Sequence, residues 1–284
     1  MRLSPGAQIV LLLVWMCASC ATASDPAGAP RPAGEKNRTT VGGPPRAERA
    51  TSQETVTYDE AGHEMDIYVP ASATPGAPPV LIVHGVSHDS SPKDFSGFAE
   101  WGARLSAAGH VVAVPNFDAV PGGSRAGVAQ LREAVRFLRR HVGGRDAGSL
   151  GLVMMGFSAG GPDWVEASFD PANQPVNALV GYYAEIEPPR PSDGSESRSL
   201  AGQLASNDKP ALLAYGLEDT APRILSSLRT FRRRASPAGH PTTILTHTGA
   251  RHGFDFLEHD SRTRAIISRT MDFISSAPGP GERP

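Results

Sequence analysis

The stretch Leu150-Gly151-Leu152-Val153-Met154-Met155-Gly156-Phe157-Ser158-Ala159-Gly160 decides the fold of this chain. Its apolar first half is typical of a strand that is buried in a parallel sheet. The segment from Ala159 to about Phe169 has the pattern of a helix. A G-x-S-x-G sequence between a strand and a helix predicts a sharp turn that projects the Ser158 hydroxyl from the end of the sheet. Gly156 and Gly160 are expected where strand and helix approach too closely for a Cβ. A chance match in a glycine-rich chain is the alternative, and the strand–helix context argues against it.

Strand and helix patterns alternate on both sides of this turn. Residues 55–59 and 64–69, joined by a turn that contains Gly62, predict an N-terminal β-hairpin. Further strands are expected at 79–84, 110–115, 150–155, 177–183, 210–216 and 242–246, and helices at 95–107, 124–142, 159–169, 220–235 and 258–275. Such alternation predicts the α/β class, with a mainly parallel sheet of about eight strands and helices on both faces.

The two ends of the chain have a different composition from the middle. Residues 1–23 combine Arg2, a short apolar core and small residues, which predicts a signal peptide and therefore export. Cleavage after Ala23 and a lipoprotein signal with a lipidated Cys20 are both compatible with the sequence. Residues 24–50 are predicted to be a disordered tether, and residues 277–284 a disordered tail. The catalytic domain is expected at residues 51–276.

Composition and charge exclude several function classes. The formal net charge of −2 gives no basic surface of the kind that binds nucleic acid. Cys17 and Cys20 are the only cysteines, so the expected domain has no internal disulfide. His84 and His88 are four residues apart, but they fall at a strand end with no third ligand, so no metal site and no cofactor are expected. A lipidated Cys20 is the only membrane contact that the sequence suggests.

Polar residues that follow strands suggest a catalytic set. In a parallel sheet, chemistry gathers at the carboxyl ends of the strands. Ser158, Asp219 and His252 each follow a predicted strand, in that chain order. His252 would act as general base for Ser158, and Asp219 would orient the imidazole. The alternatives are a loop histidine for His252, a helix-capping role for Asp219, and Glu218 in place of Asp219.

A reaction through a tetrahedral intermediate also needs donors for an oxyanion. The backbone N–H groups of Ala159 and Val86 are the expected pair, with Gly85 allowing the tight turn before Val86. Gly85, Phe157 and Tyr183 are predicted to contact substrate. Trp164 and Phe254 are further aromatic residues that suit either the cleft or the core.

These motifs together resemble α/β-hydrolases of the dienelactone hydrolase and small carboxylesterase kind. The resemblance rests on His84-Gly85, Gly156-Phe157-Ser158-Ala159-Gly160-Gly161, Gly216-Leu217-Glu218-Asp219 and His252-Gly253-Phe254, with Tyr182-Tyr183 in addition. It implies an α/β-hydrolase fold over roughly residues 55–275. Dienelactone hydrolases generally carry a cysteine nucleophile, and Ser158 in its place argues against a dienelactone substrate. The glycine run of lipase-like esterases after His-Gly is also missing.

The predicted function is that of an exported serine hydrolase that cleaves a small-molecule carboxylic ester through an acyl-enzyme intermediate. A peptidase or amidase on the same fold, or a non-catalytic binding protein, are the alternatives. Residues 185–209 are poor in apolar side chains and are predicted to form a mobile flap with no apolar lid. Short acyl chains are therefore the expected substrates.

Overall fold

The computed structural model describes residues 52–85, 91–142, 151–187, 199–207, 209–235 and 241–278. These residues all lie in one compact unit, Pro45–Pro284. The predicted signal peptide at 1–23 and tether at 24–50 lie outside the described residues, as do residues 279–284 of the predicted tail. In the part of the chain that is described, no helix has the length and apolar character needed to cross a membrane.

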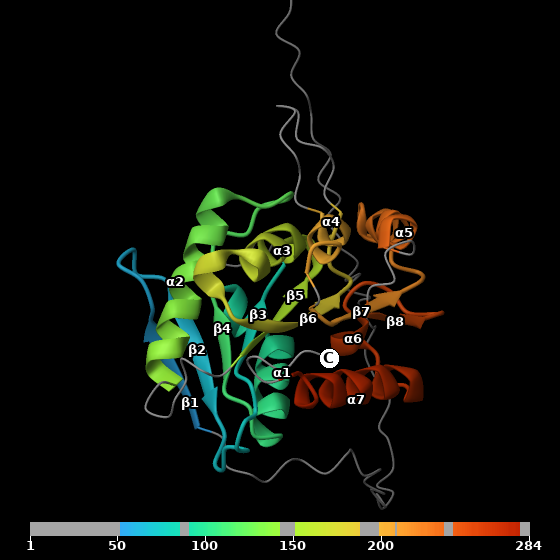
Figure 1. Ribbon diagram of the computed structural model, residues 1–284. Helices are drawn as coiled ribbons and strands as arrows, with labels where there is room; N and C mark the ends of the chain where they lie inside the picture. The colour runs from blue at the N-terminus through green and yellow to red at the C-terminus, as the bar shows by residue number, and fades with distance from the viewer. Residues whose placement is uncertain are drawn as a thin grey trace, which may run out of the picture. The chain divides into compact units, whose positions relative to one another are not determined.

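Eight strands form a single, mainly parallel sheet, which confirms the predicted α/β class (Figure 1). They are β1 (Ser52–Thr57), β2 (Glu64–Val69), β3 (Val80–Val83), β4 (Val112–Pro115), β5 (Leu152–Phe157), β6 (Val176–Tyr182), β7 (Ala211–Gly216) and β8 (Thr242–His247). Their order is β1-β2-β4-β3-β5-β6-β7-β8. Only β1 with β2 and β2 with β4 pair in the antiparallel direction. The predicted N-terminal hairpin is therefore confirmed.

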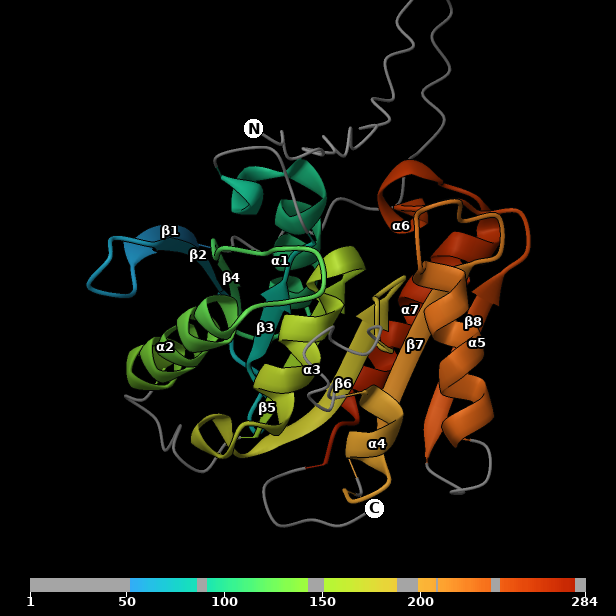
Figure 2. The ribbon, with the colours of Figure 1, turned by 90° about the horizontal axis from the view of Figure 1, so that it is seen from above.

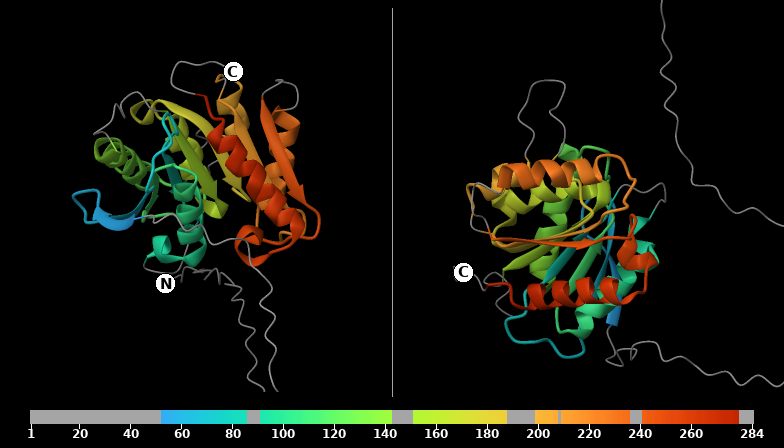
Figure 3. Two further views of the ribbon diagram at one scale, coloured as in Figure 1. Left: turned by 90° about the horizontal axis from the view of Figure 1, so that it is seen from below. Right: turned by 90° about the vertical axis from the view of Figure 1, so that its right-hand side faces the viewer.

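Helices cover both faces of the sheet. They are α1 (Ser96–Ala107), α2 (Arg125–Val142), α3 (Gly161–Phe169), α4 (Leu200–Leu204), α5 (Ile224–Ala235), α6 (Phe254–Leu257) and α7 (Ser261–Ser275), with the 3₁₀ turns η1 (Pro92–Asp94), η2 (Ser158–Gly160) and η3 (Pro171–Asn173). Helices α1 and α7 lie on one face, and α2, α3 and α5 lie on the other (Figure 2). Figure 3 shows α5 and α7 separated by the sheet.

Strand β5 shows why the central strands read as continuous apolar runs. All six of its residues are buried, because helices pack on both faces of the sheet. Trp164 of α3 is completely buried behind this strand, and its indole N–H donates to the carbonyl of Met154. A Cβ on Gly156 would lie 2.4 Å from the Trp164 ring. The predicted close approach of strand and helix at Gly156 is therefore confirmed.

Several predicted boundaries were wrong for local reasons. Helix α5 begins at Ile224 and not at 220, because the Asp219 carboxylate accepts the N–H of Ala221 and Arg223 adopts a left-handed backbone with φ of 70°. Helix α7 begins at Ser261 and not at 258, because the Asp260 side chain caps it by accepting the N–H of Thr263. A separate short helix, α6, precedes it.

The prediction of a mobile flap at 185–209 was wrong at both of its described ends. Glu185, Ile186 and Glu187 are buried, and Leu200, Ala201 and Leu204 of α4 belong to the core. The N–H of Leu200 donates to the Ile186 carbonyl, which ties the two ends of the segment together. Buried contacts of this kind come from long-range packing, so the polar composition of the segment did not reveal them.

Candidate active site

The predicted catalytic residues lie together at the carboxyl edge of the sheet. Ser158 directly follows β5, Asp219 follows β7, and His252 lies between β8 and α6. Ser158 has a φ of 51°, a left-handed conformation that is rare for a residue with a side chain. Such strain persists only where the surroundings enforce it, and it is found mainly at functional sites. The sharp turn after β5 therefore has the geometry that the G-x-S-x-G sequence predicts.

A chain of two hydrogen bonds joins these three side chains. Ser158 Oγ lies 2.9 Å from His252 Nε2, and His252 Nδ1 lies 2.8 Å from Asp219 Oδ2. Since a carboxylate only accepts, Nδ1–H donates to Asp219 and leaves Nε2 free to accept from the serine hydroxyl. Asp219 is buried and Glu218 is exposed, so the geometry places Asp219 and not its neighbour against the imidazole. Asp219 also accepts the N–H of Ala221 at 2.8 Å, so it caps this turn as well.

The backbone of the serine turn is held by tight contacts with its neighbours. The N–H of Glu185 donates to the carbonyl of Ser158 at 2.9 Å. A Cβ on Gly160 would lie 1.9 Å from the carbonyl oxygen of His84, and a Cβ on Gly85 would lie 2.8 Å from the Cβ of Ser158. Larger residues at either glycine would displace the serine. Gly85 therefore leaves space for Ser158 in addition to lining the pocket described below.

His84 is a buried, neutral histidine that shapes the loop after β3. Its Nδ1–H donates to the Gly85 carbonyl at 2.7 Å, and its Nε2 accepts the N–H of Phe117 at 3.3 Å. Burial lowers the pKa of His84 to about 4. Both ring nitrogens are thus engaged with the backbone, and His88, the other half of the His pair considered from the sequence, lies outside the described residues.

One of the two expected oxyanion donors can be located. Ala159 is the second residue of η2, within the first turn, where backbone N–H groups have no partner inside the helix. Ala159 is half-buried and directly follows Ser158, the place in the chain from which the sequence predicts an oxyanion donor. Val86, the other expected donor, lies outside the described residues.

An apolar pocket opens beside Ser158 and His252. Its volume is about 340 Å³, within the range of small-molecule sites. It is lined by Gly85, Pro92, Phe95, Phe98, Phe157, Ser158, Tyr183, His252, Gly253, Phe256 and Leu257. Phe98 packs edge-on against Phe95, Phe157 and Phe256. This wall of phenylalanines gives the site a buried apolar surface that was not predicted from the sequence.

The three predicted substrate-contacting residues all line the pocket, and the two aromatic residues that suited either cleft or core lie in the core. Gly85, Phe157 and Tyr183 line the pocket, whereas Trp164 and Phe254 are completely buried and do not. The sequence analysis missed the phenylalanines of α1 and α6. Two sequence features could have indicated these pocket residues. One is the set of aromatic residues three apart at the start of the 95–107 segment, and the other is Phe254-Asp255-Phe256-Leu257 directly after His252-Gly253.

Among the described residues, one group of three side chains has the spacing of a metal site. His247, Glu258 and Asp260 bring their ligand atoms within 4.8 Å of one another. His247 Nε2 lies 2.9 Å from Asp260 Oδ2, and Asp260 also caps α7. These protein contacts account for the arrangement without an ion.

Known proteins are similar to this chain in sequence and in fold. The family model described as BD-FAE matches residues 65–162. Esterase 2 of Thermogutta terrifontis in its native form is similar to 84% of the chain, covering 97% of its own length, with a TM-score of 0.62 and 18% identity. Carboxyl esterase 2 of the fungus Tuber melanosporum matches 81% of the chain and 88% of its own length, with a TM-score of 0.62 and 18% identity. A putative dienelactone hydrolase of Klebsiella pneumoniae matches 80% of the chain and 99% of its own, with a TM-score of 0.60 and 17% identity.

The chain has the α/β-hydrolase fold, and the matched family model covers about a third of it. A curated relative, kynurenine formamidase of Danio rerio, is 27% identical over an alignment of 169 positions that covers 55% of this chain. The chain spans about half the length of that relative, 54%. These comparisons agree in supporting a hydrolase built on the α/β-hydrolase fold.

Proposed function

We propose that this α/β-hydrolase is a serine esterase that cleaves a carboxylic ester through an acyl-enzyme intermediate. The observation that carries the proposal is the unbroken Ser158–His252–Asp219 hydrogen-bond chain, which opens onto an apolar pocket. A binding protein has no need for a serine held in a strained conformation within hydrogen-bond distance of an imidazole.

The geometry suggests the role of each residue. His252 Nε2 takes the Ser158 proton as Oγ attacks the ester carbonyl carbon, and Asp219 stabilises the resulting imidazolium. The N–H of Ala159, with that of Val86 as the expected second donor, stabilises the oxyanion of the tetrahedral intermediate. Collapse expels the alcohol, which receives the proton from His252. Water then attacks the acyl carbonyl carbon while His252 Nε2 takes a proton from it. Collapse of the second intermediate breaks the bond to Ser158 Oγ, which receives that proton from His252, and the acid is released.

Hydrolysis of p-nitrophenyl butyrate by the wild type and by Ser158→Ala tests this proposal. Loss of the nucleophile is expected to lower kcat on the order of 10⁶-fold. Circular dichroism should remain unchanged, because Ser158 is only half-buried and its truncation leaves little cavity. Retention of a tenth of the wild-type activity would contradict the assignment of Ser158.

Amide cleavage is a second candidate because a relative carries the name of a formamidase. The same three residues serve amide and ester cleavage, so the site geometry alone does not separate them. The comparison of p-nitrophenyl butyrate with p-nitrobutyranilide does. We expect the ester to have the higher kcat/KM, and a preference for the anilide would favour an amidase.

The pocket also sets the expected size of the acyl group. An apolar cavity of about 150 Å³ is enough to hold a benzene molecule, so the 340 Å³ beside Ser158 suits a short chain or one ring. Each further buried methylene contributes about 0.8 kcal/mol only while the pocket still has room for it. We therefore propose a preference for acyl chains of about two to six carbons, without interfacial activation. More efficient turnover of p-nitrophenyl palmitate than of the butyrate would overturn this preference.

We also propose that the protein is exported, on the basis of the signal-like sequence at residues 1–23. Removal of residues 1–50 should leave hydrolysis close to wild type and retain the protein inside a bacterial host cell. Equal export of both forms would contradict the proposal. Growth with radiolabelled palmitate distinguishes the two forms of processing. A protein lipidated at Cys20 incorporates the label, whereas a protein cleaved after Ala23 does not.

A further inference from the structure

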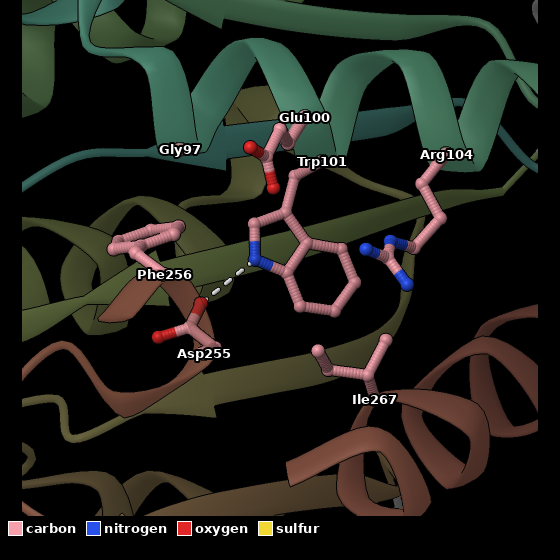
Figure 4. Close-up of a pocket in the computed structure, with 7 residues that line it drawn as sticks. All are labelled: Gly97, Glu100, Trp101, Arg104, Asp255, Phe256 and Ile267. Carbon is pink, nitrogen blue, oxygen red and sulfur yellow. Dashed lines mark hydrogen bonds between the residues drawn. The ribbon is translucent and has the colours of Figure 1, made fainter. Parts of the chain in front are cut away.

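A buried carboxylate, Asp255, lies behind the candidate active site and has no role in the mechanism described above. It is in α6, three residues after His252, and is 6% exposed. Its Oδ2 accepts the indole N–H of Trp101 at 2.8 Å, and its Oδ1 accepts the hydroxyl of Tyr183 at 2.9 Å. Figure 4 shows the Trp101 contact, with Asp255 reaching from α6 toward α1. Three elements therefore meet at this one side chain.

Tyr183 connects this carboxylate to the imidazole. Its ring lies 4.5 Å from the ring of His252, centroid to centroid, and it lines the pocket with Ser158. Tyr183 has a φ of 37°, an unfavourable conformation for a residue with a side chain. Its N–H donates to the carbonyl of Ala214, and its hydroxyl is held by Asp255. The carboxylate thus anchors the far end of a strained residue whose ring supports His252.

The two hydrogen bonds of Asp255 do not explain why this residue carries a negative charge. Among the described residues, no Lys or Arg side chain makes an ion pair with it. Burying a carboxylate without a cation is costly. An asparagine could accept from Trp101 and donate to Tyr183 without that cost, because a phenol oxygen also accepts. A negative charge here is useful if a positive charge develops nearby during turnover.

We propose that Asp255 is a positioning residue for the proposed esterase reaction, which holds Tyr183 against His252 and stabilises the imidazolium through its negative charge. Burial raises the pKa of Asp255 to about 6, while Trp101, Tyr183 and a protonated His252 oppose that rise. The hydrogen bonds from Trp101 and Tyr183 favour the charged form of the carboxylate. The inference rests on the proposed function, since it concerns the proton that His252 takes from Ser158.

Other titratable groups near Asp255 do not replace it. Asp255 lines a crevice between α1 and α6, and Glu100 and Arg104 of α1 line it too (Figure 4). Both of these side chains are exposed, so water and salt screen their charges. Tyr182 at the end of β6 and Tyr183 directly after it lie near Asp255, and burial raises the pKa of both phenols, which keeps them neutral. Asp219 contacts His252 directly through Nδ1. Helix α7 contributes the apolar Ile267 to the crevice.

Asp255→Asn tests the charge while retaining both hydrogen-bond partners. We expect kcat for p-nitrophenyl butyrate to fall about tenfold with little change in KM, and the acidic limb of the kcat/KM profile to move about one pH unit lower. Asp163→Asn is the matched control, because Asp163 is also buried and its pKa is also raised to about 6. The Asp163 side chain accepts the N–H of Ser124, so the pH profile of Asp163→Asn should match that of the wild type.

Trp101→Phe gives a second test if Asp255→Asn does not fold. This change removes one donor to the carboxylate without touching the pocket, and we expect shifts in the same directions but smaller. A wild-type kcat and acidic limb in Asp255→Asn, or in Trp101→Phe when it alone folds, would overturn the inference. So would an equal change in Asp163→Asn.

Failure of this inference is distinguishable from failure of the proposed function. The inference alone is contradicted if the wild type hydrolyses the ester, Ser158→Ala does not, and Asp255→Asn has the kcat and the pH profile of the wild type. A wild-type protein without any Ser158-dependent hydrolysis contradicts both.

Discussion

At the scale of single residues, the candidate site depends on which side chains are buried and which are exposed. Asp219 is enclosed between the Ala221 N–H and His252, whereas Glu218 next to it faces solvent. The sequence predicted an acidic residue at this place and favoured Asp219 because a helix start follows closely. Helix α5 begins later than expected, but the turn still directs Asp219 inward.

Asp219→Asn should lower kcat on the order of 10⁴-fold, because an amide favours the wrong imidazole tautomer. Glu218→Gln is the matched control, since it makes the same chemical change one residue away on an exposed side chain. Steady-state kinetics with p-nitrophenyl butyrate measures both. A larger loss in Glu218→Gln would exchange the roles of the two residues.

At the scale of elements, the strands and the longer helices could be predicted, and the short helices α4 and α6 could not. Strands β3 and β5 are buried on both faces and appear as apolar runs, and α2 repeats its apolar residues at helical spacing. Helices α4 and α6 span only five and four residues, too few for a period to appear. Part of the pocket wall was missed for this reason, because Phe256 and Leu257 belong to α6.

Phe256→Ala tests how α6 and α1 limit the pocket. The Phe256 ring packs against Phe95, Phe98 and Phe157, so its removal extends the cavity toward α1. We expect the acyl-chain optimum to move to esters about two carbons longer, since each methylene gains about 0.8 kcal/mol where room exists. Activity on p-nitrophenyl acetate in the same variant serves as the internal control. An unchanged optimum would mean that the acyl group lies elsewhere.

At the scale of the whole domain, buried carboxylates make stability depend on pH. Burial raises the pKa of both Asp163 and Asp255 to about 6. Their unfolded values lie near 3.9, so between these limits the folded protein binds more protons than the unfolded chain. The free energy of unfolding contributed by these groups therefore falls as pH rises from about 4 to 6.

Asp163→Asn should remove one part of this dependence. The difference in unfolding free energy between the variant and the wild type is expected to shift in favour of the variant as pH rises from about 4 to 6, and then to level off. Urea denaturation at several pH values across this range measures it. A difference that stays constant with pH would show that Asp163 does not titrate there.

Covalent labelling with a fluorophosphonate probe tests the central claim most directly, because the probe reacts only with an activated serine. The account predicts one adduct per chain at pH 7.5, located on Ser158 by peptide mass spectrometry. It also predicts no adduct in Ser158→Ala and strongly slowed labelling in His252→Ala, since His252 Nε2 accepts the serine proton. An adduct on another serine, or a folded wild-type protein that remains unlabelled, would contradict it.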